Sequence, residues 1–295
     1  MNTHSTALAA PETAALPADL ELGAVRLRVR DLARAAAFYR DIVGLTPIDT
    51  AGGVARLGAG GAVLVELEQS CDAPPRPRGS TGLFHLAILV PDRPALAVVV
   101  QRLLAHRVRL GASDHLVSEA LYITDPDGNG IEIYRDRRRD EWEWQGRSVH
   151  MATMQLDLRS VLADLPAGAA VDTPLPPGTR MGHVHLQVAD LTDARRFYVD
   201  RLGFDVTTER YPGALFVSAG GYHHHLGLNV WDSRNGGPAA EGAIGLVHYT
   251  VRLPDAAAVA QIRRRLTEAG EAVRDIPGGF AVADPWRTTA HVVAR

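Results

Sequence analysis

The chain has 295 residues, of which 46% are hydrophobic and 22% are charged, and its formal net charge is −3. This length allows two domains with separate cores, and the charge gives no reason to expect nucleic acid or an anionic membrane as a partner. No apolar run approaches the roughly 18 residues that a membrane span needs, and the single cysteine, Cys71, cannot form an internal disulfide, which favours a reducing cytoplasm.

The segment 1–136 is predicted to be a tail followed by the same set of elements twice. Residues 1–21 lack the basic start of a signal peptide and are expected to be a disordered tail. Hydrophobic periodicity and turn residues then predict a strand, a helix and short strands at 25–29, 32–43, 54–57 and 62–67. After a loop rich in Pro and Arg, the order returns with a strand, a helix and two strands at 83–90, 93–106, 121–123 and 131–134.

The second half of the chain repeats the first. Residues at six positions recur at one constant spacing, namely Val25, Asp31, Leu32, Phe38, Tyr39 and Gly44 at Val184, Asp190, Leu191, Phe197, Tyr198 and Gly203. Asp125-Pro126 recurs at the same spacing as Asp284-Pro285, and His85 recurs at a slightly larger spacing as His248. The repeat predicts an α+β protein of four βαβββ modules, with two modules in a first domain at 22–136 and two in a second domain at 181–295. Residues 137–180 between them are expected to be a linker with a short amphipathic helix near 156–165.

Polar residues at matching positions distinguish the four modules. Glu132 follows the turn Asp125-Pro126-Asp127-Gly128-Asn129-Gly130 and stands among apolar strand residues, so it is either solvent-facing or a buried charge that needs a metal or cationic partner. The other modules differ here: Glu132 aligns with His291, Tyr122 with Ala281, and His183 with Ala24. Modules two and three therefore hold polar residues that modules one and four mostly lack.

Three consecutive histidines, His223 to His225, lie in module three. If they belong to a strand, His223 and His225 share one face and His224 takes the other. They could form a surface cluster, but Gly220, Gly221 and Gly227 around them would let the backbone crowd a site.

The fourfold βαβββ pattern, the DPDGNGIE turn and strand, and the histidines that begin strands resemble the vicinal oxygen chelate superfamily. Within it, residues 22–295 resemble the type I extradiol ring-cleaving dioxygenases, especially the two-domain bacterial catechol 2,3-dioxygenases. The resemblance implies two barrels of the glyoxalase/bleomycin-resistance/dioxygenase type. It also implies a mononuclear Fe(II) site, less often Mn(II), held by two imidazoles and one carboxylate.

The site residues implied by the resemblance lie in modules two and three. His85, Glu132 and His183 match the metal ligands, although His185 shares a face with His183 and could replace it. Tyr122, ten residues before Glu132, matches the tyrosine of the family. His225 is the expected acid–base residue, with His224 as the next choice, and His115 matches a further pocket histidine more loosely.

One departure from the family concerns where these ligands stand. In the extradiol enzymes all three ligands come from the third and fourth modules, whereas here His85 and Glu132 belong to module two and His183 to module three. The simplest explanation is a different pairing of the modules, in which module two forms a barrel with module three, and module one forms a barrel with module four. The sequence leaves open whether the paired modules belong to one chain or to two.

The function implied by the resemblance is cleavage of catechol or a substituted catechol by dioxygen, giving a 2-hydroxymuconic semialdehyde, in a cytoplasmic homo-oligomer. Two other classes share the fold. A metal-dependent isomerase of the glyoxalase or epimerase type usually has four protein ligands, including a second carboxylate. A metal-free drug-binding protein of the bleomycin-resistance type would lack the ligand set altogether.

Overall fold

The computed structural model describes residues 15–295 and contains the four expected βαβββ modules. Module one consists of β1 (Glu21–Val29), α1 (Leu32–Phe38) with a π-helical turn (Tyr39–Val43), β2 (Thr46–Ala51), β3 (Val54–Ala59) and β4 (Ala62–Gln69). Module two consists of β5 (Gly82–Leu89), α2 (Arg93–Ala105), β6 (Gly111–Asp114), β7 (Ser118–Thr124) and β8 (Gly130–Asp136).

The second half of the chain repeats this order after a connecting segment. The segment holds a 3₁₀ turn (Arg139–Glu141), β9 (Trp144–Gln145), β10 (Ser148–Val149), β11 (Met154–Gln155) and the expected short helix α3 (Leu158–Leu162). Module three consists of β12 (Arg180–Gln187), α4 (Leu191–Arg195) with a π-helical turn (Arg196–Arg201), β13 (Asp205–Thr208), β14 (Ala214–Ser218) and β15 (Leu226–Asn229). Module four consists of β16 (Gly245–Leu253), α5 (Ala256–Glu268), β17 (Val273–Ile276), β18 (Gly279–Ala283) and β19 (Thr289–Ala294).

A repeated aspartate explains why the α-helix of each module begins where it does. The residue before the helix is an extended Asp in all four modules, and its carboxylate accepts hydrogen bonds from backbone N–H groups of the first turn; these residues are Asp31, Asp92, Asp190 and Asp255. Because those N–H groups have no partner within the helix, the side chain supplies the missing acceptor and fixes the start.

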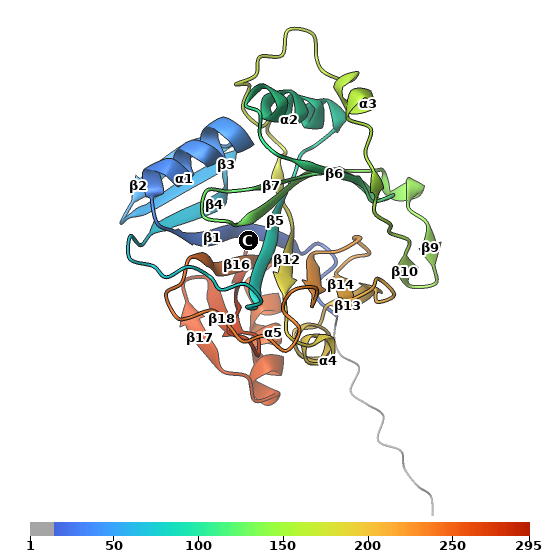
Figure 1. Cartoon of the computed structure of the whole chain (residues 1–295). Helices are drawn as coiled ribbons and strands as arrows, with labels where there is room; N and C mark the ends of the chain where they lie inside the picture. Colours follow the sequence, from blue (N-terminus) through green and yellow to red (C-terminus); the bar gives the residue numbers. More distant parts are fainter. Residues whose placement is uncertain (1–14) are drawn as a thin grey trace, which may run out of the picture.

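The modules pair across the two halves of the sequence. In each module the first and last strands are parallel neighbours, while β5 pairs antiparallel with β12 and β1 with β16. Modules two and three therefore share a nine-stranded sheet, and modules one and four share an eight-stranded sheet. Figure 1 shows β5 and β12 side by side in the middle of the molecule. The alternative pairing is confirmed, and both partners belong to the same chain.

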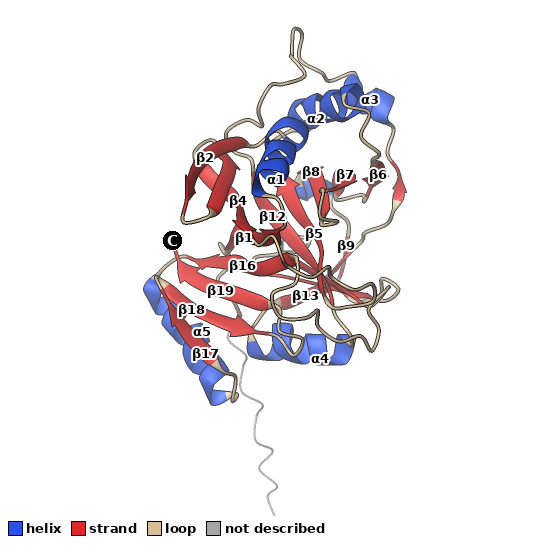
Figure 2. Ribbon diagram, turned by 60° about the vertical axis from the view of Figure 1, so that its left-hand side comes forward, coloured by secondary structure: helices blue, strands red, loops and turns tan. Residues whose placement is uncertain are grey.

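The two sheets share a hydrophobic core, and the helices lie outside them. One continuous cluster of buried apolar side chains includes residues from all four modules. Figure 2 shows the helices at two opposite ends of the molecule with the strands between them. In residues 15–295, no helix has the length and apolar character needed to cross a membrane.

Residues 15–21, which were expected to belong to a disordered tail, are part of the folded structure. Leu16 and Leu20 are buried, the Leu16 N–H donates to the Gly203 carbonyl, and Glu21 already belongs to β1. The expectation failed here because burial of isolated leucines in an irregular segment leaves no periodic pattern. Residues 1–14 of the expected tail lie outside the described residues.

A repeated Tyr–Asp pair forms a hydrogen bond between the two modules of each half. The Tyr39 hydroxyl donates to the Asp125 carboxylate at 3.2 Å, and the Tyr198 hydroxyl donates to the Asp284 carboxylate at 2.9 Å. All four side chains are buried. The recurrence of Tyr39 and Asp125 at one shared spacing in the sequence therefore preserves one buried hydrogen bond between the two modules of each half.

The Asp284 carboxyl makes the stability of this fold depend on pH. Burial raises the pKa of Asp284 to about 6, so the folded chain holds this proton more tightly than the unfolded chain does. The resulting contribution to the free energy of unfolding is fully present below about pH 4 and is lost as the pH rises through the folded pKa, a change of up to about 3 kcal/mol.

Asp284→Asn isolates this contribution because the amide does not titrate. Urea unfolding of both proteins from pH 4 to pH 8 should give a stability difference that moves in favour of the variant up to about pH 6 and is constant above it. A difference that does not change with pH would contradict the assignment.

Candidate metal centre

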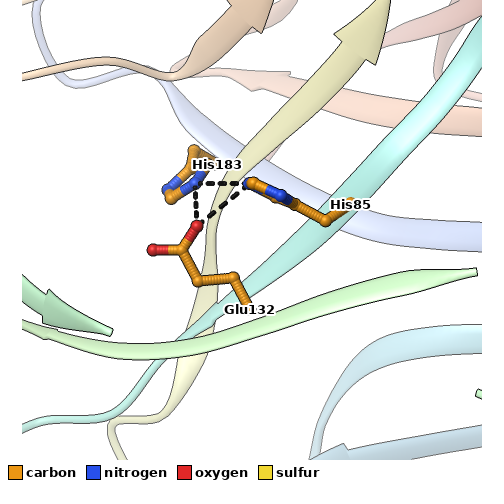
Figure 3. A group of neighbouring side chains, drawn as sticks. All are labelled: His85, Glu132 and His183. Carbon is orange, nitrogen blue, oxygen red and sulfur yellow. Dashed lines mark hydrogen bonds and ion pairs between the residues drawn. The ribbon is translucent and has the colours of Figure 1, made fainter. Parts of the chain in front are cut away.

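The centre of the nine-stranded sheet brings the three expected ligand side chains together. His85 on β5 faces His185 on the antiparallel strand β12, and Glu132 on β8 stands beside Ala87 of β5. Because alternate residues of a strand share a face, His183 projects to the same side as His185. Figure 3 shows His85, Glu132 and His183 pointing toward one another from these three strands.

The three ligand atoms form a small triangle. The Glu132 Oε2 atom lies 3.0 Å from His85 Nε2 and 3.1 Å from His183 Nε2, and the two Nε2 atoms are 3.3 Å apart. Donor atoms held about 2.1 Å from one metal ion at right angles to each other would lie about 3 Å apart. The triangle therefore fits one face of an octahedral site, which would leave positions on the opposite face for other molecules.

The electrostatics of the triangle favour the protonation states that bind a metal. Burial raises the pKa of Glu132, but the imidazoles of His183 and His85 outweigh that effect and hold this pKa well below its ordinary value. Burial also lowers the pKa of His183 to about 4. A charged carboxylate beside a neutral imidazole is the donor set that a divalent cation requires.

A cavity of about 260 Å³ opens beside the triangle. Aromatic and other apolar side chains form much of its wall: Phe84, Val117, Tyr122, Met151, Tyr211, Phe216 and Trp231. Among residues 15–295, Glu132 is the only acidic residue in the lining, and no lysine or arginine belongs to it. This composition suits a small, mostly apolar molecule that contacts the triangle at one end.

Tyr122 and His115 lie in this cavity and bond to each other. His115 Nε2 lies 2.7 Å from the Tyr122 hydroxyl oxygen, and His115 Nδ1 lies 2.8 Å from the Ala152 carbonyl oxygen. Because a carbonyl only accepts, the proton of a neutral His115 is on Nδ1, and the Tyr122 hydroxyl donates to Nε2. Burial, with Glu132 nearby, raises the pKa of Tyr122 well above its ordinary value, so the phenol stays protonated.

The structure contradicts the expected position of His225 and places His224 in the cavity instead. The His224 ring lines the cavity with its centroid 4.2 Å from that of His183. His225 is buried outside the cavity, where its Nδ1 lies 2.9 Å from Ser218 Oγ and accepts from the Ala219 N–H at 3.3 Å. The expectation failed because strand β15 begins only at Leu226, so residues 223–225 do not alternate as a strand does.

His185 lines the cavity but does not belong to the triangle. Its ring packs between aromatic side chains and against Gly227, where an added Cβ would come within 2.8 Å of the ring. Its Nε2 atom is buried and has no hydrogen-bond partner in residues 15–295. Of the two candidates on β12, the geometry therefore favours His183 as the ligand.

Several cavity residues could not be identified from the sequence. Met151 and Thr153 come from the connecting segment, and Trp231 and Tyr211 come from loops of module three. No periodic pattern marks such positions, because loop residues reach a site through the path of the backbone and not through strand alternation. Asp136 was also not singled out, although it ends the strand that carries Glu132.

The matching positions of the eight-stranded sheet hold no equivalent group. His248 and His291 stack face to face with ring centroids 3.6 Å apart. Within the described part of the chain, His85, Glu132 and His183 form the one group of three such side chains whose ligand atoms lie within 4.8 Å of one another. The differences between modules in the sequence thus correspond to a difference between the two sheets.

Comparison with known proteins places the chain in a family. The family model described as "Glyoxalase/Bleomycin resistance protein/Dioxygenase superfamily" matches residues 21–133 and 180–287. The chain is 44% identical over 273 residues to the catechol-2,3-dioxygenase of Bacillus subtilis (strain 168), which covers 90% of this chain and 94% of that protein.

Solved structures show the same fold. Glyoxalase I from Zea mays superposes with a TM-score of 0.58 at 17% identity, covering 94% of this chain and 92% of that one. A protein of Bacillus subtilis subsp. subtilis str. 168 superposes with a TM-score of 0.65 at 14% identity, covering 92% of this chain and 84% of that one. The chain therefore belongs to the glyoxalase/bleomycin resistance protein/dioxygenase superfamily and is a relative of a catechol-2,3-dioxygenase.

Proposed function

We propose that this protein is an extradiol dioxygenase that cleaves catechol, or a catechol with an uncharged substituent, at an Fe(II) ion held by His85, Glu132 and His183. The observation that carries the proposal is the triangle of two imidazoles and one carboxylate at the end of an otherwise largely apolar cavity. Two imidazoles and one carboxylate on one face are the ligand set of non-haem Fe(II) oxygenases. The 44% identity to the catechol-2,3-dioxygenase of Bacillus subtilis supports the same reaction.

When bound, the metal supplies a Lewis acid and an electron path between the substrate and dioxygen. The reaction is balanced without a further reductant, because both oxygen atoms of dioxygen enter the product while one ring C–C bond breaks. The protein must then bind the ring, exclude water and move one proton. The aromatic wall of the cavity binds the ring, and the absence of a basic lining residue favours catechols without a carboxylate substituent.

Tyr122 and His224 are the residues that we assign to the substrate oxygens. Burial lowers the pKa of His224 well below its ordinary value, so its imidazole is neutral and can take a proton from a substrate hydroxyl and later return it. The Tyr122 hydroxyl, oriented by His115, can hydrogen-bond a substrate oxygen next to Glu132. Proton transfer by a positioned group is the protein's main chemical contribution to this reaction.

The two other classes are disfavoured by specific features of the centre. An isomerase of the glyoxalase type usually has a second carboxylate ligand, and Glu132 is the only carboxylate in the group of ligand atoms found among residues 15–295. A metal-free binding protein would have no use for a carboxylate buried against two imidazoles, which is costly without a cation.

The test is metal analysis combined with anaerobic and aerobic addition of catechol. The purified protein should contain or take up about one Fe(II) per chain, bind catechol without turnover under anaerobic conditions, and release a yellow ring-cleavage product when air is admitted. Parallel loading with Mn(II) identifies which metal supports turnover. A protein that converts a hemithioacetal but leaves catechol intact in air would overturn the proposal.

A further inference from the structure

A chain of hydrogen bonds runs from the cavity to the end of strand β8. His224 Nδ1 lies 2.7 Å from His223 Nδ1, and His223 Nε2 lies 2.9 Å from Asp136 Oδ1. His223 is fully buried, whereas the Asp136 side chain is 21% exposed. The carboxylate that ends this chain lies on the same strand as Glu132, four residues further along.

The order of donors and acceptors fixes where the protons are. An ionised carboxyl group only accepts, so the proton of a neutral His223 is on the Nε2 that faces Asp136. His223 Nδ1 is then an acceptor, and the proton in the short contact with His224 must come from His224 Nδ1. The second nitrogen of this His224 tautomer, Nε2, is left with a lone pair, on a ring that lines the cavity.

The surrounding side chains hold this chain in place. The Tyr222 hydroxyl donates to Asp136 Oδ1 at 3.3 Å, and the Tyr134 hydroxyl lies 2.7 Å from the Tyr222 hydroxyl. The His223 ring packs against the rings of Tyr222 and Trp142, whose centroids are 4.1 Å and 5.2 Å away. A ring that packs against two aromatic side chains and is hydrogen-bonded at both nitrogens keeps one orientation.

We propose that Asp136 and His223 are positioning residues that hold His224 in the tautomer whose Nε2 lone pair faces the substrate. The inference rests on the proposed function, since it concerns how the same cavity takes up a proton. In the opposite tautomer His224 would present an N–H to the substrate hydroxyl and could not accept its proton. When Nε2 takes the proton, the Nδ1–H remains bonded to His223, and the Asp136 carboxylate at the far end stabilises the positive charge. The proton later returns to the substrate, so neither positioning residue is consumed.

Two substitutions at His223 separate positioning from simple packing. His223→Ala removes the acceptor for His224 Nδ1–H, and we expect kcat to fall about tenfold or more while the KM for catechol and the iron content stay close to those of the unchanged protein. In His223→Asn the side-chain oxygen can occupy the place of Nδ1 and accept the same proton. This variant should therefore recover most of the lost kcat, although it fills less of the space that the imidazole occupied.

Asp136→Ala and His248→Ala complete the experiment. Asp136 is partly exposed at a strand end, so its removal should leave the fold intact and lower kcat in the same direction as His223→Ala. His248 is a buried histidine of the other sheet, and His248→Ala should leave kcat unchanged.

The outcomes distinguish the two proposals. If the unchanged protein cleaves catechol but Asp136→Ala and His223→Ala turn over equally fast with full iron, the positioning role is wrong and the proposed function stands. If His223→Ala and His223→Asn lose kcat equally, the residue is needed only for packing and the positioning role is again wrong. If the unchanged iron-loaded protein does not cleave catechol, the proposed function itself fails.

Discussion

Glu132→Ala is expected to remove the metal and to lower the rate of ring cleavage by about a thousandfold or more, while the fold is retained. Glu132 provides the only negative charge among the three ligand atoms, and both imidazoles approach the same carboxylate oxygen. Two neutral imidazoles alone bind Fe(II) weakly. The substitution removes the one oxygen ligand and, with it, the negative charge that neutralises half of the charge of the metal ion. The buried charge is removed with its ligand, so no unpaired carboxylate remains to destabilise the core.

The same loss is expected for His85→Ala and His183→Ala, and the other sheet provides the control. His248 aligns with His85 and is similarly buried, and His291 aligns with Glu132, but their rings stack on each other without a third ligand. Iron content and turnover are measured for Glu132→Ala, His85→Ala and His183→Ala, with His248→Ala as the control. If His85→Ala kept full iron and turnover while His248→Ala lost both, the metal would lie in the other sheet, and the assignment of His85, Glu132 and His183 as ligands would be wrong.

His224→Ala is expected to keep the iron and to bind catechol, but to cleave it about a hundredfold more slowly, the usual contribution of a positioned acid–base group. Its ring lines the cavity next to His183, whereas the ring of the neighbouring His225 does not. The Nδ1 atom of His225 already accepts a hydrogen bond from the backbone N–H of Ala219. His225→Ala is thus the matched comparison, since it deletes an equally buried imidazole one residue away.

The measurement is iron content beside kcat for both variants, with anaerobic catechol binding as a check of the site. An iron-free His224→Ala protein would identify His224 as a ligand. Undiminished turnover of His224→Ala together with slow turnover of His225→Ala would identify His225 as the acid–base residue, as the sequence had suggested.

The grouping of His85, Glu132 and His183 could be predicted from the sequence, whereas the histidine of residues 223–225 that lines the cavity could not. His85, Glu132 and His183 each lie on a regular strand, where alternation fixes the face and the repeat shows which modules lack the residue. His224 and His225 lie just before a strand, after two glycines with positive φ, so no periodicity determines which ring enters the cavity. The sequence also supplied a reason to re-pair the modules, because the ligands could meet only if module two joined module three.

The pairing of β1 with β16 has a consequence for how the chain acquires its structure during synthesis. Glu21 of β1 stands opposite Arg252 of β16, and β5 pairs with β12, so neither half of the sequence is a closed unit. Until β16 leaves the ribosome, the β1 edge has no partner and its unpaired N–H and C=O groups can pair with another chain. Such distant contacts give a high contact order, which slows folding and prolongs exposure of this edge. Chaperone binding to nascent chains should therefore concentrate on those that already contain β1 but do not yet include all of β16.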